Sequence, residues 1–289
     1  MSKVFSLNND QHPAEILLLG GKGKTGKKIA DRLSRLGQPY RYSSRQGQPR
    51  FEWEDQSTWR SVLKNSNSVY IAYQPDLAAP GAVQKIDELT KLAVSEGVSK
   101  LVLLSGRGEQ EAEECEKIVM GSGIDWTILR CSWFNQNFSE GYLLEPLQQN
   151  YVALPVPNVS EPFVDTDDIA DVAVAALMGS EHVGQLYELT GPDLLTFEEA
   201  VKIISEALGR EVVYEKVSFE DYSSALLTYG VPPELIDLLK YLFITVLDGR
   251  NESVTDGVEK ALGRKPKAFA QFVKESISVG VWNVLQETY

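Results

Sequence analysis

The chain has 289 residues, of which 43% are hydrophobic and 24% charged, values typical of a globular protein with a substantial core. Its formal net charge of −13 argues against nucleic acid as a direct partner, because non-specific binding depends on Lys and Arg releasing counterions. No apolar run is long enough to span a membrane, and the opening MSKVFSLNND lacks the apolar core of a signal peptide.

Cysteines and histidines are few. Cys115 and Cys131 are the only two cysteines, and their spacing indicates neither a metal site nor a disulfide framework. A reducing, cytoplasmic location fits this best, and we expect no metal. His12 and His182 stand in loop-like contexts away from any nucleophile or ligand cluster, so we expect both at the surface.

Residues 15–33, EILLLGGKGKTGKKIADRL, predict a buried strand, a glycine-rich turn and the start of an amphipathic helix. Glycines let the backbone turn sharply and approach a pyrophosphate closely. The N–H groups of the first helical turn and the helix dipole then face its negative charge. In this context the pattern predicts the phosphate cradle of a dinucleotide-binding fold, with an ordinary tight turn as the alternative.

Two glycine frames fit this turn. Gly20, Gly23 and Gly26 read as G-x-x-G-x-x-G, the spacing of extended and atypical short-chain dehydrogenase/reductases. Starting from Gly21 instead gives G-x-G-x-x-G. We prefer the first frame because Gly20 follows the strand directly.

The first two-thirds of the chain alternates predicted strands and helices. After the first strand, the strand candidates are residues 39–43, 67–73, 100–105, 126–130 and 185–190, and the clearest helical patterns between them are 82–95 and 168–178. Such alternation predicts an α/β fold with a Rossmann-type, doubly wound parallel sheet covered by helices on both faces.

After the last predicted strand the chain is expected to be mainly helical. Thr196 and Glu199 form a capping box before a helix that Gly209 ends. Further helical patterns cover residues 232–247 and 266–285. Because this tail cannot extend the alternating pattern, we expect it to form a smaller, substrate-side lobe.

These patterns suggest two domains. Residues 14–190 would form the NAD(P)-binding Rossmann domain, with residues 134–165 contributing to the substrate side. Residues 191–289 would form the smaller lobe.

The end of the second predicted strand indicates which nicotinamide cofactor is bound. An acidic side chain there accepts hydrogen bonds from the ribose of NAD, whereas an arginine accommodates the extra phosphate of NADP. Residues 40–50 read YRYSSRQGQPR, with no acid until Glu52. Arg45 could pair with the 2′-phosphate and Ser44 could donate a hydrogen bond to it, so the pattern favours NADP(H). A solvated surface arginine is the alternative.

Nine segments together resemble, in order, an NmrA-like branch of the atypical short-chain dehydrogenase/reductases. They are LLLGGKGKTGKKIA, SSR, FEWED, LLSGRGE, SGIDWTILR, SWFNQNFSE, PFVDTDDIADVAVAAL, YELTGPDLLTFEEA and LDGRN. The closest similarity is to NADPH-dependent clavine dehydrogenases of ergot alkaloid pathways and their bacterial relatives. The resemblance covers nearly the whole chain and is specific for fold and cofactor, but much less so for substrate.

The resemblance implies where the cofactor and the substrate bind. The matching cofactor positions are Gly20, Gly23, Lys24, Thr25 and Gly26 at the pyrophosphate, Ser44 and Arg45 at the 2′-phosphate, Glu52 and Trp53 beside adenine, Ala72, Tyr73 and Gln74 beside the ribose, and Ser105 with Gly106 at the end of the next strand. Lys24 and Thr25 are expected to point at the phosphates. Trp133, Phe134 and Asn137 would line the nicotinamide and substrate cleft, with plain core packing as the alternative for the two aromatics.

One family feature is missing from the sequence. Typical members of the wider superfamily use Tyr-x-x-x-Lys to move a proton at the reacting oxygen. Matching Glu116 to the family glutamate puts Gly108 and Ala112 at the tyrosine and lysine positions. The gap fits an iminium, quinone or conjugated acceptor better than a simple ketone, with Tyr73 and Ser105 as weak candidate donors.

Two functional hypotheses follow. The first is an NADPH-dependent oxidoreductase that passes a hydride to a planar small-molecule electrophile without the dyad. The second is an NADP-binding redox sensor that acts through a protein partner, as NmrA-like regulators do. Sugar-nucleotide epimerisation ranks last, because it needs the missing tyrosine base.

Overall fold

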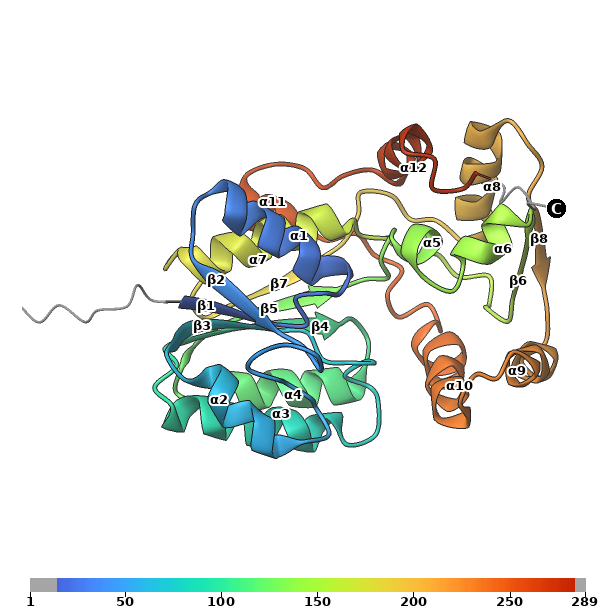
Figure 1. The fold of residues 1–289 in the computed structure, drawn as a ribbon. Coiled ribbons are helices and arrows are strands. Elements are labelled where there is room, and N and C mark those ends of the chain that lie inside the picture. The colour runs from blue at the N-terminus through green and yellow to red at the C-terminus, as the bar shows by residue number, and fades with distance from the viewer. Residues whose placement is uncertain (1–14, 284–289) are drawn as a thin grey trace, which may run out of the picture.

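The computed structural model describes residues 15–283, and a six-stranded parallel sheet lies at the centre of one lobe (Figure 1). The strand order across the sheet is β2-β1-β3-β4-β5-β7. The strands are β1 (Glu15–Leu19), β2 (Tyr40–Ser43), β3 (Ser66–Ile71), β4 (Lys100–Gly106), β5 (Asp125–Cys131) and β7 (Gln185–Leu189). The predicted α/β fold with a doubly wound parallel sheet is confirmed.

Helices cover both faces of this sheet (Figure 1). One face carries α1 (Lys24–Arg35), α7 (Thr166–Met178) and α11 (Gly257–Leu262), and the other carries α2 (Trp59–Leu63), α3 (Ala82–Ser95) and α4 (Gln110–Met120). Successive side chains of a strand point to opposite faces, so Ile16 and Leu18 pack toward α1 and α7. Leu17 and Leu19 pack toward the opposite layer. Burial on both faces explains why β1 reads as a continuous apolar run.

The sheet has a topological switch point between β1 and β3. From β1 the chain crosses to β2 on one side, and from β2 it returns to β3 on the other side of β1. A crevice opens at the carboxyl ends of strands at such a point. Gly20 follows β1 there with φ +95°, and a Cβ on it would lie 2.9 Å from the Ala72 Cβ that follows β3. Only glycine fits this position without strain.

The second lobe is mainly helical, as predicted. It contains α5 (Asn137–Glu140), α6 (Leu144–Gln148), β6 (Tyr151–Leu154), α8 (Phe197–Leu208), β8 (Val213–Lys216), α9 (Phe219–Thr228), α10 (Pro233–Lys240), a π-helix (Tyr241–Val246) and α12 (Phe269–Ser278). Its core is aromatic: the Phe163 ring lies 5.4 Å from that of Phe138 and 5.1 Å from that of Phe197. The Trp282 indole N–H donates to the Phe138 carbonyl at 2.7 Å and ties the end of the described chain to this core.

A short parallel pair, β6 with β8, was not predicted. Each strand has four residues, too few for an alternating pattern to stand out. The β-branched and aromatic run around Val213 and Tyr214 was the available signal. The capping box at Thr196 and Glu199 is confirmed, since both of its hydrogen bonds are present.

The division of the chain at residue 190 remains a prediction. The core of the second lobe also takes side chains from residues 138–163, within the range expected on the substrate side. Helix α11, by contrast, packs on α7 and β7 of the first lobe, where Val258 is buried. Residues 14 and 284–289 of the two predicted domains lie outside the described part of the chain.

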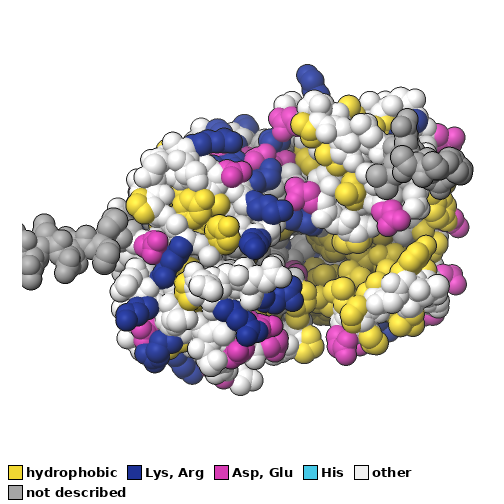
Figure 2. All heavy atoms as spheres, viewed as in Figure 1, with side chains coloured by type: hydrophobic (Ala, Val, Ile, Leu, Met, Phe, Trp, Pro, Cys, Tyr) yellow, Lys and Arg dark blue, Asp and Glu magenta, His cyan; other side chains and the backbone are white. Residues whose placement is uncertain are grey.

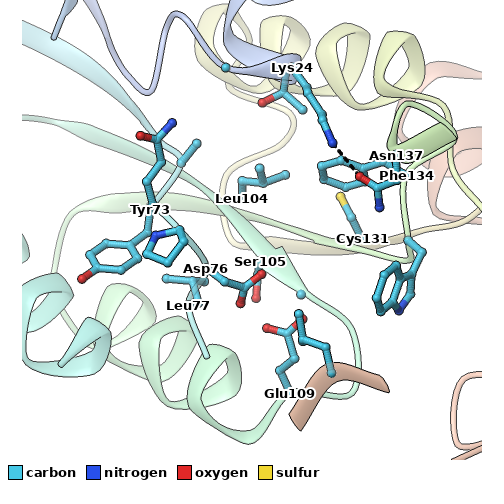
Figure 3. Close-up of a pocket in the computed structure, with 18 of the residues that line it drawn as sticks. Lys24, Tyr73, Asp76, Leu77, Leu104, Ser105, Glu109, Cys131, Phe134 and Asn137 are labelled. Carbon is cyan, nitrogen blue, oxygen red and sulfur yellow. Dashed lines mark hydrogen bonds between the residues drawn. The ribbon is translucent and has the colours of Figure 1, made fainter. Parts of the chain in front are cut away.

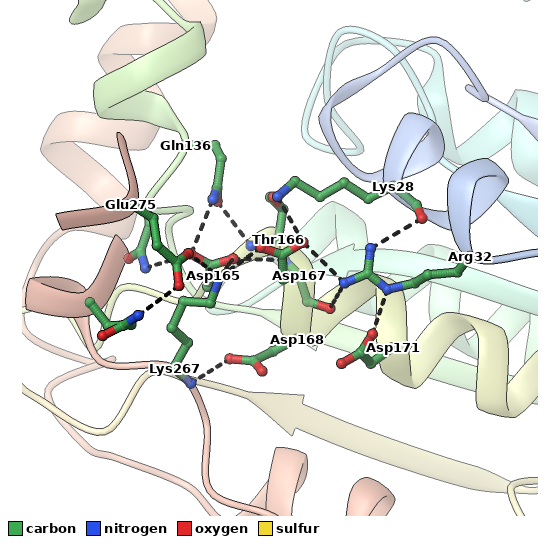
Figure 4. A network of polar contacts seen from close by, with 12 residues as sticks. Lys28, Arg32, Gln136, Asp165, Thr166, Asp167, Asp168, Asp171, Lys267 and Glu275 are labelled. Atoms are coloured by element: carbon green, nitrogen blue, oxygen red, sulfur yellow. Dashed lines mark hydrogen bonds and ion pairs between the residues drawn. The ribbon is translucent and has the colours of Figure 1, made fainter. Parts of the chain in front are cut away.

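A charged network joins the two lobes (Figure 4). The Lys267 ammonium lies 2.7 Å from Asp167 on α7 and 2.8 Å from Glu275 on α12. Asp167 in turn pairs with Lys28 and Arg32 of α1 at 2.9 and 3.0 Å. The network therefore links the helix that follows the glycine turn to the second lobe, and its cations hold the pKa of Asp167 well below its ordinary value despite burial.

The expectation that His182 lies at the surface is wrong. Its side chain is buried, with Nδ1 2.9 Å from the Tyr187 hydroxyl, because the segment after α7 folds back against β7. His12 falls before the first described residue. Of the helices within residues 15–283, none is both long and apolar enough to cross a membrane.

Glu161 gives the protein a pH-dependent stability. It is 1% exposed, and burial, reinforced by the charge of Glu252 against the opposing attraction of Arg107, raises the pKa of its carboxyl from 4.5 to about 7. Between these two values the folded state binds more protons than the unfolded chain. This carboxyl therefore lowers the stability as the pH rises through that interval, and its effect is complete above about pH 7.

Glu161→Gln is therefore expected to raise the free energy of unfolding at pH 8 by up to about 3 kcal/mol and to change it little at pH 4.5. Urea unfolding at the two pH values measures this difference. Glu114→Gln, at an exposed position of α4, is the control and should show no pH-dependent gain. A loss of stability at pH 8 in Glu161→Gln would contradict the prediction.

Candidate functional site

Two cavities lie along the carboxyl edge of the sheet. One has a volume of about 460 Å³ and lies between the sheet and the second lobe, and the other, of about 800 Å³, lies beside the end of β2. Gly20, Gln74 and Pro75 line both. The cavities therefore meet at the switch point and together form one groove.

The glycine turn forms the middle of this groove. A Cβ on Gly26 would overlap the Gly20 carbonyl oxygen and lie 2.6 Å from the Gly21 Cα, so α1 can start this close to β1 only with glycine there. Gly23 donates its N–H to the Gly20 carbonyl at 2.9 Å. The start of α1 thus faces the groove with its first-turn N–H groups, as a pyrophosphate requires.

Lys24 and Thr25 lie at this turn, but their side chains have other contacts. The Lys24 ammonium reaches across the cleft and donates to Asn137 Oδ1 at 2.6 Å (Figure 3). Burial lowers the pKa of Lys24, against the attraction of Glu140. The Thr25 hydroxyl is buried and accepts from the Tyr70 hydroxyl at 2.9 Å. Asn137, expected beside the substrate, therefore bridges the two lobes through Lys24.

The larger cavity contains the residues expected at adenosine and its 2′-phosphate. Ser44, Arg45, Glu52 and Trp53 all line it. The Ser44 hydroxyl is buried and has no hydrogen-bond partner within residues 15–283, whereas Arg45 is exposed at the rim. A phosphate group placed here could accept hydrogen bonds from both the Ser44 hydroxyl and the Arg45 guanidinium. These residues therefore fit the 2′-phosphate of NADP(H).

Two expected cofactor residues were also weak candidates for the proton donor, and the structure favours neither of them. Burial raises the pKa of the Tyr73 hydroxyl. Figure 3 shows its ring directed away from Ser105. The Ser105 hydroxyl donates to Glu116 Oε1 at 2.6 Å, so its proton is already used.

The positions of the missing dyad are filled by backbone and by packing. Gly108 has φ +82°, and a Cβ on it would lie 2.7 Å from the side-chain nitrogen of Asn251. That amide donates to the Arg107 carbonyl at 3.0 Å, and Arg250 donates to the Gly108 carbonyl at 3.0 Å. The LDGRN segment thus holds the loop after β4 in place. No tyrosine could occupy position 108 in this conformation.

Asp76 and Glu109 form a carboxyl pair in the smaller cavity, which was not predicted from the sequence; Glu109 is buried and Asp76 is half-buried. Asp76 follows β3, Glu109 precedes α4, and their carboxyl groups lie close to each other (Figure 3). Burial raises the pKa of both carboxyls, and the charge of Asp76 raises that of Glu109 further. The available sequence signal was one acid shortly after each of two neighbouring strands.

The second lobe supplies an apolar wall to the same cavity. Trp133 and Phe134 line it, and Trp133 also stacks on Phe243 of the π-helix with a centroid distance of 5.5 Å. The wall is completed by leucines that the sequence reading missed, namely Leu235, Leu238, Leu239 and Leu242. Figure 2 shows hydrophobic side chains gathered in this hollow near α10 and Lys and Arg side chains on the opposite side. This wall fits the apolar part of a small molecule.

Comparison with known proteins agrees with this arrangement. Agroclavine dehydrogenase of Claviceps purpurea is 30% identical over 281 residues, which cover 89% of this chain and 95% of that protein. An NADPH-dependent quinone oxidoreductase of Escherichia coli, solved with NADPH, has a similar fold (TM-score 0.72, 20% identity, 91% of this chain and 99% of that one). A protein of Staphylococcus aureus described as a nucleoside-diphosphate-sugar epimerase is also similar (TM-score 0.78, 18% identity, 90% and 99%). The model of the NmrA-like family matches residues 50–273. Because that match spans most of the chain, the protein belongs to the NmrA-like family.

Proposed function

We propose that this protein is an NADPH-dependent oxidoreductase that reduces a planar small-molecule electrophile of the iminium, quinone or enone type. The observation that carries the proposal is the continuous groove. Ser44 and Arg45 at one end would bind the 2′-phosphate, and an apolar cavity lies at the other end. An agroclavine dehydrogenase and an NADPH-dependent quinone oxidoreductase among the similar proteins support it.

Each part of the groove would have a separate task. The turn from Gly20 to Gly26 would hold the pyrophosphate, and Ser44 with Arg45 would select the 2′-phosphate. When bound, NADPH would supply the hydride. Trp133 and the leucines of α10 would exclude water and hold the acceptor flat, so that positioning accounts for much of the rate.

The apolar cavity favours an enzyme over a sensor. A sensor needs only the cofactor half of the groove, whereas here a second cavity of about 460 Å³ lies beside it. Titration with NADPH and NADH, followed by NADPH consumption with quinones, enones and cyclic iminium salts, tests the proposal. Turnover with any of them supports it. Tight NADPH binding without consumption across the panel would favour a redox sensor with a protein partner.

Arg45→Ala is expected to weaken NADPH binding by about 10- to 100-fold and to leave NADH binding unchanged, because a charged hydrogen bond contributes about 1.5–3 kcal/mol. Equilibrium titration of the two cofactors measures this. Arg35→Ala, at an exposed arginine of α1, is the matched control. Equal losses for both cofactors would show that Arg45 does not read the 2′-phosphate.

A further inference from the structure

We propose that Glu109, with Asp76 beside it, is the proton donor of this cavity, and that its acceptor is therefore a carbonyl compound of the quinone class. The inference rests on the proposed function, since the proton is needed only if a hydride is delivered in the same cavity. A carboxyl pair, with Asp76 after β3 and Glu109 before α4, would take the role of the missing Tyr-x-x-x-Lys dyad.

The position of Glu109 is the first argument. Its backbone directly precedes α4, but its side chain folds back over the end of β4, so that a Cβ on Gly106 would overlap Glu109 Oε1. The residue is 8% exposed and lines the cavity together with Trp133 and Leu238. The carboxyl thus lies at the carboxyl edge of the sheet, where an acceptor between the cofactor and the apolar wall would lie (Figure 3).

The surroundings of the carboxyl are the second argument. Glu109 Oε2 is fully buried and has no hydrogen-bond partner within residues 15–283. The Asp76 carboxyl lies close to that of Glu109 and accepts from the Ala78 N–H at 2.9 Å. Two carboxylates cannot face each other without a cation or a proton between them, so the pair retains a proton.

Several other charged or titratable groups lie near the pair. They are Glu111 and Glu116 on α4, Cys131 on β5, Tyr241 on the π-helix and Arg107 on the loop after β4. The two glutamates raise the pKa of Glu109 further. Arg107 is engaged elsewhere, since it donates to the carbonyls of Asn251 and Ser253 at 3.0 and 2.9 Å. Of the two carboxyls, Glu109 is therefore the one favoured to carry the proton of the pair.

The other hydroxyls of the cavity are poorer acids. The Ser105 proton is directed to Glu116, and the Tyr73 ring is directed away from Ser105, as described above. Tyr142 also lines the cavity, but a phenol ordinarily has a pKa of about 10, so a carboxyl gives up a proton far more readily at neutral pH. Asp76 is only partly buried, so it can pass a replacement proton from solvent to Glu109.

The step balances as follows. With NADPH bound, one carbonyl oxygen of the quinone would gain the hydride, so that an O–H bond forms as a C–H bond of the reduced nicotinamide breaks. Electron pairs would shift through the conjugated ring onto the second carbonyl oxygen. That oxygen would take the Glu109 proton as the O–H bond of the carboxyl breaks. The products would be the hydroquinone, the oxidised cofactor and the Glu109 carboxylate, which regains a proton from water through Asp76. An iminium acceptor is neutralised by hydride alone and needs no such proton.

The test compares two acceptors in the intact protein, 1,4-naphthoquinone and the N-methyl-3,4-dihydroisoquinolinium cation. Glu109→Gln should lower kcat with the quinone by about 100-fold or more, since general acid catalysis contributes about 10²–10⁴-fold. Turnover of the iminium should stay within about threefold, and NADPH affinity within about twofold. Glu114→Gln, at an exposed glutamate of the same helix, is the matched control.

A second variant, Asp76→Asn, tests the pH dependence of kcat, which would not change if Glu109 had only a structural role. With the wild type and the quinone, kcat should fall as the pH rises through the pKa of Glu109. Asp76→Asn removes the charge that raises this pKa, so the fall should shift to lower pH, while the iminium profile stays flat. Thermal melting and NADPH titration establish that both variants are folded.

The outcomes separate the two proposals. Equal losses with both acceptors in Glu109→Gln, or no loss with the quinone, would overturn the role of Glu109. Turnover of the iminium but of no quinone by the wild type would also overturn it and leave the oxidoreductase standing. NADPH binding without turnover of either acceptor would overturn both.

Discussion

Gly26→Ala is expected to weaken NADPH binding by about 100-fold. The added Cβ would overlap the Gly20 carbonyl oxygen and lie 2.6 Å from the Gly21 Cα, and both are backbone atoms that cannot rotate away. The start of α1 must then move from β1, which costs about 1–3 kcal/mol and misplaces the N–H groups that face the pyrophosphate. Equilibrium titration with NADPH measures the effect.

Gly37→Ala is the control for this substitution. Gly37 follows the other end of α1, and a Cβ there would meet no atom within 4 Å, although its φ of +67° makes alanine mildly unfavourable. It should lower stability slightly and leave NADPH affinity unchanged. If Gly26→Ala bound NADPH as the wild type does, the glycine turn would not be the pyrophosphate site.

Glu116→Ala is expected to lower the free energy of unfolding by about 3–5 kcal/mol. Glu116 is 1% exposed and accepts from Arg130 Nε at 2.9 Å and from the Ser105 hydroxyl at 2.6 Å. Its removal leaves a largely buried guanidinium without its main partner, because the remaining ion pair of Arg130, with Glu188, is longer at 3.2 Å. Urea unfolding measures the loss.

Replacing both partners should cost less than replacing one. In Glu116→Met with Arg130→Met no uncompensated charge remains buried, so we expect much of the lost stability to return. Glu114→Gln on the same helix should change it by less than about 0.5 kcal/mol. A single variant as stable as the wild type would show that the Glu116–Arg130 pair does not stabilise the fold.

The sequence was sufficient for the parts of the fold that depend on local pattern. The six strands of the main sheet and the helix over residues 82–95 follow from apolar periodicity, which reports burial directly. The capping box at Thr196 follows from the side-chain chemistry of one helix end. The short pair of β6 and β8 was missed because four residues carry too little pattern.

The same distinction holds for the candidate site. The sequence by itself determined the glycine turn. It also determined that Ser44 and Arg45, and not an acidic residue, follow the second strand. Each of these is a contiguous motif with its own chemistry. Only the tertiary structure decided which distant side chains meet. Asp76 and Glu109 come together because the carboxyl ends of β3 and β4 are adjacent in the sheet. Lys24 contacts Asn137 because the start of α5 in the second lobe lies near the start of α1. Such contacts depend on strand order and lobe packing, which no local pattern encodes.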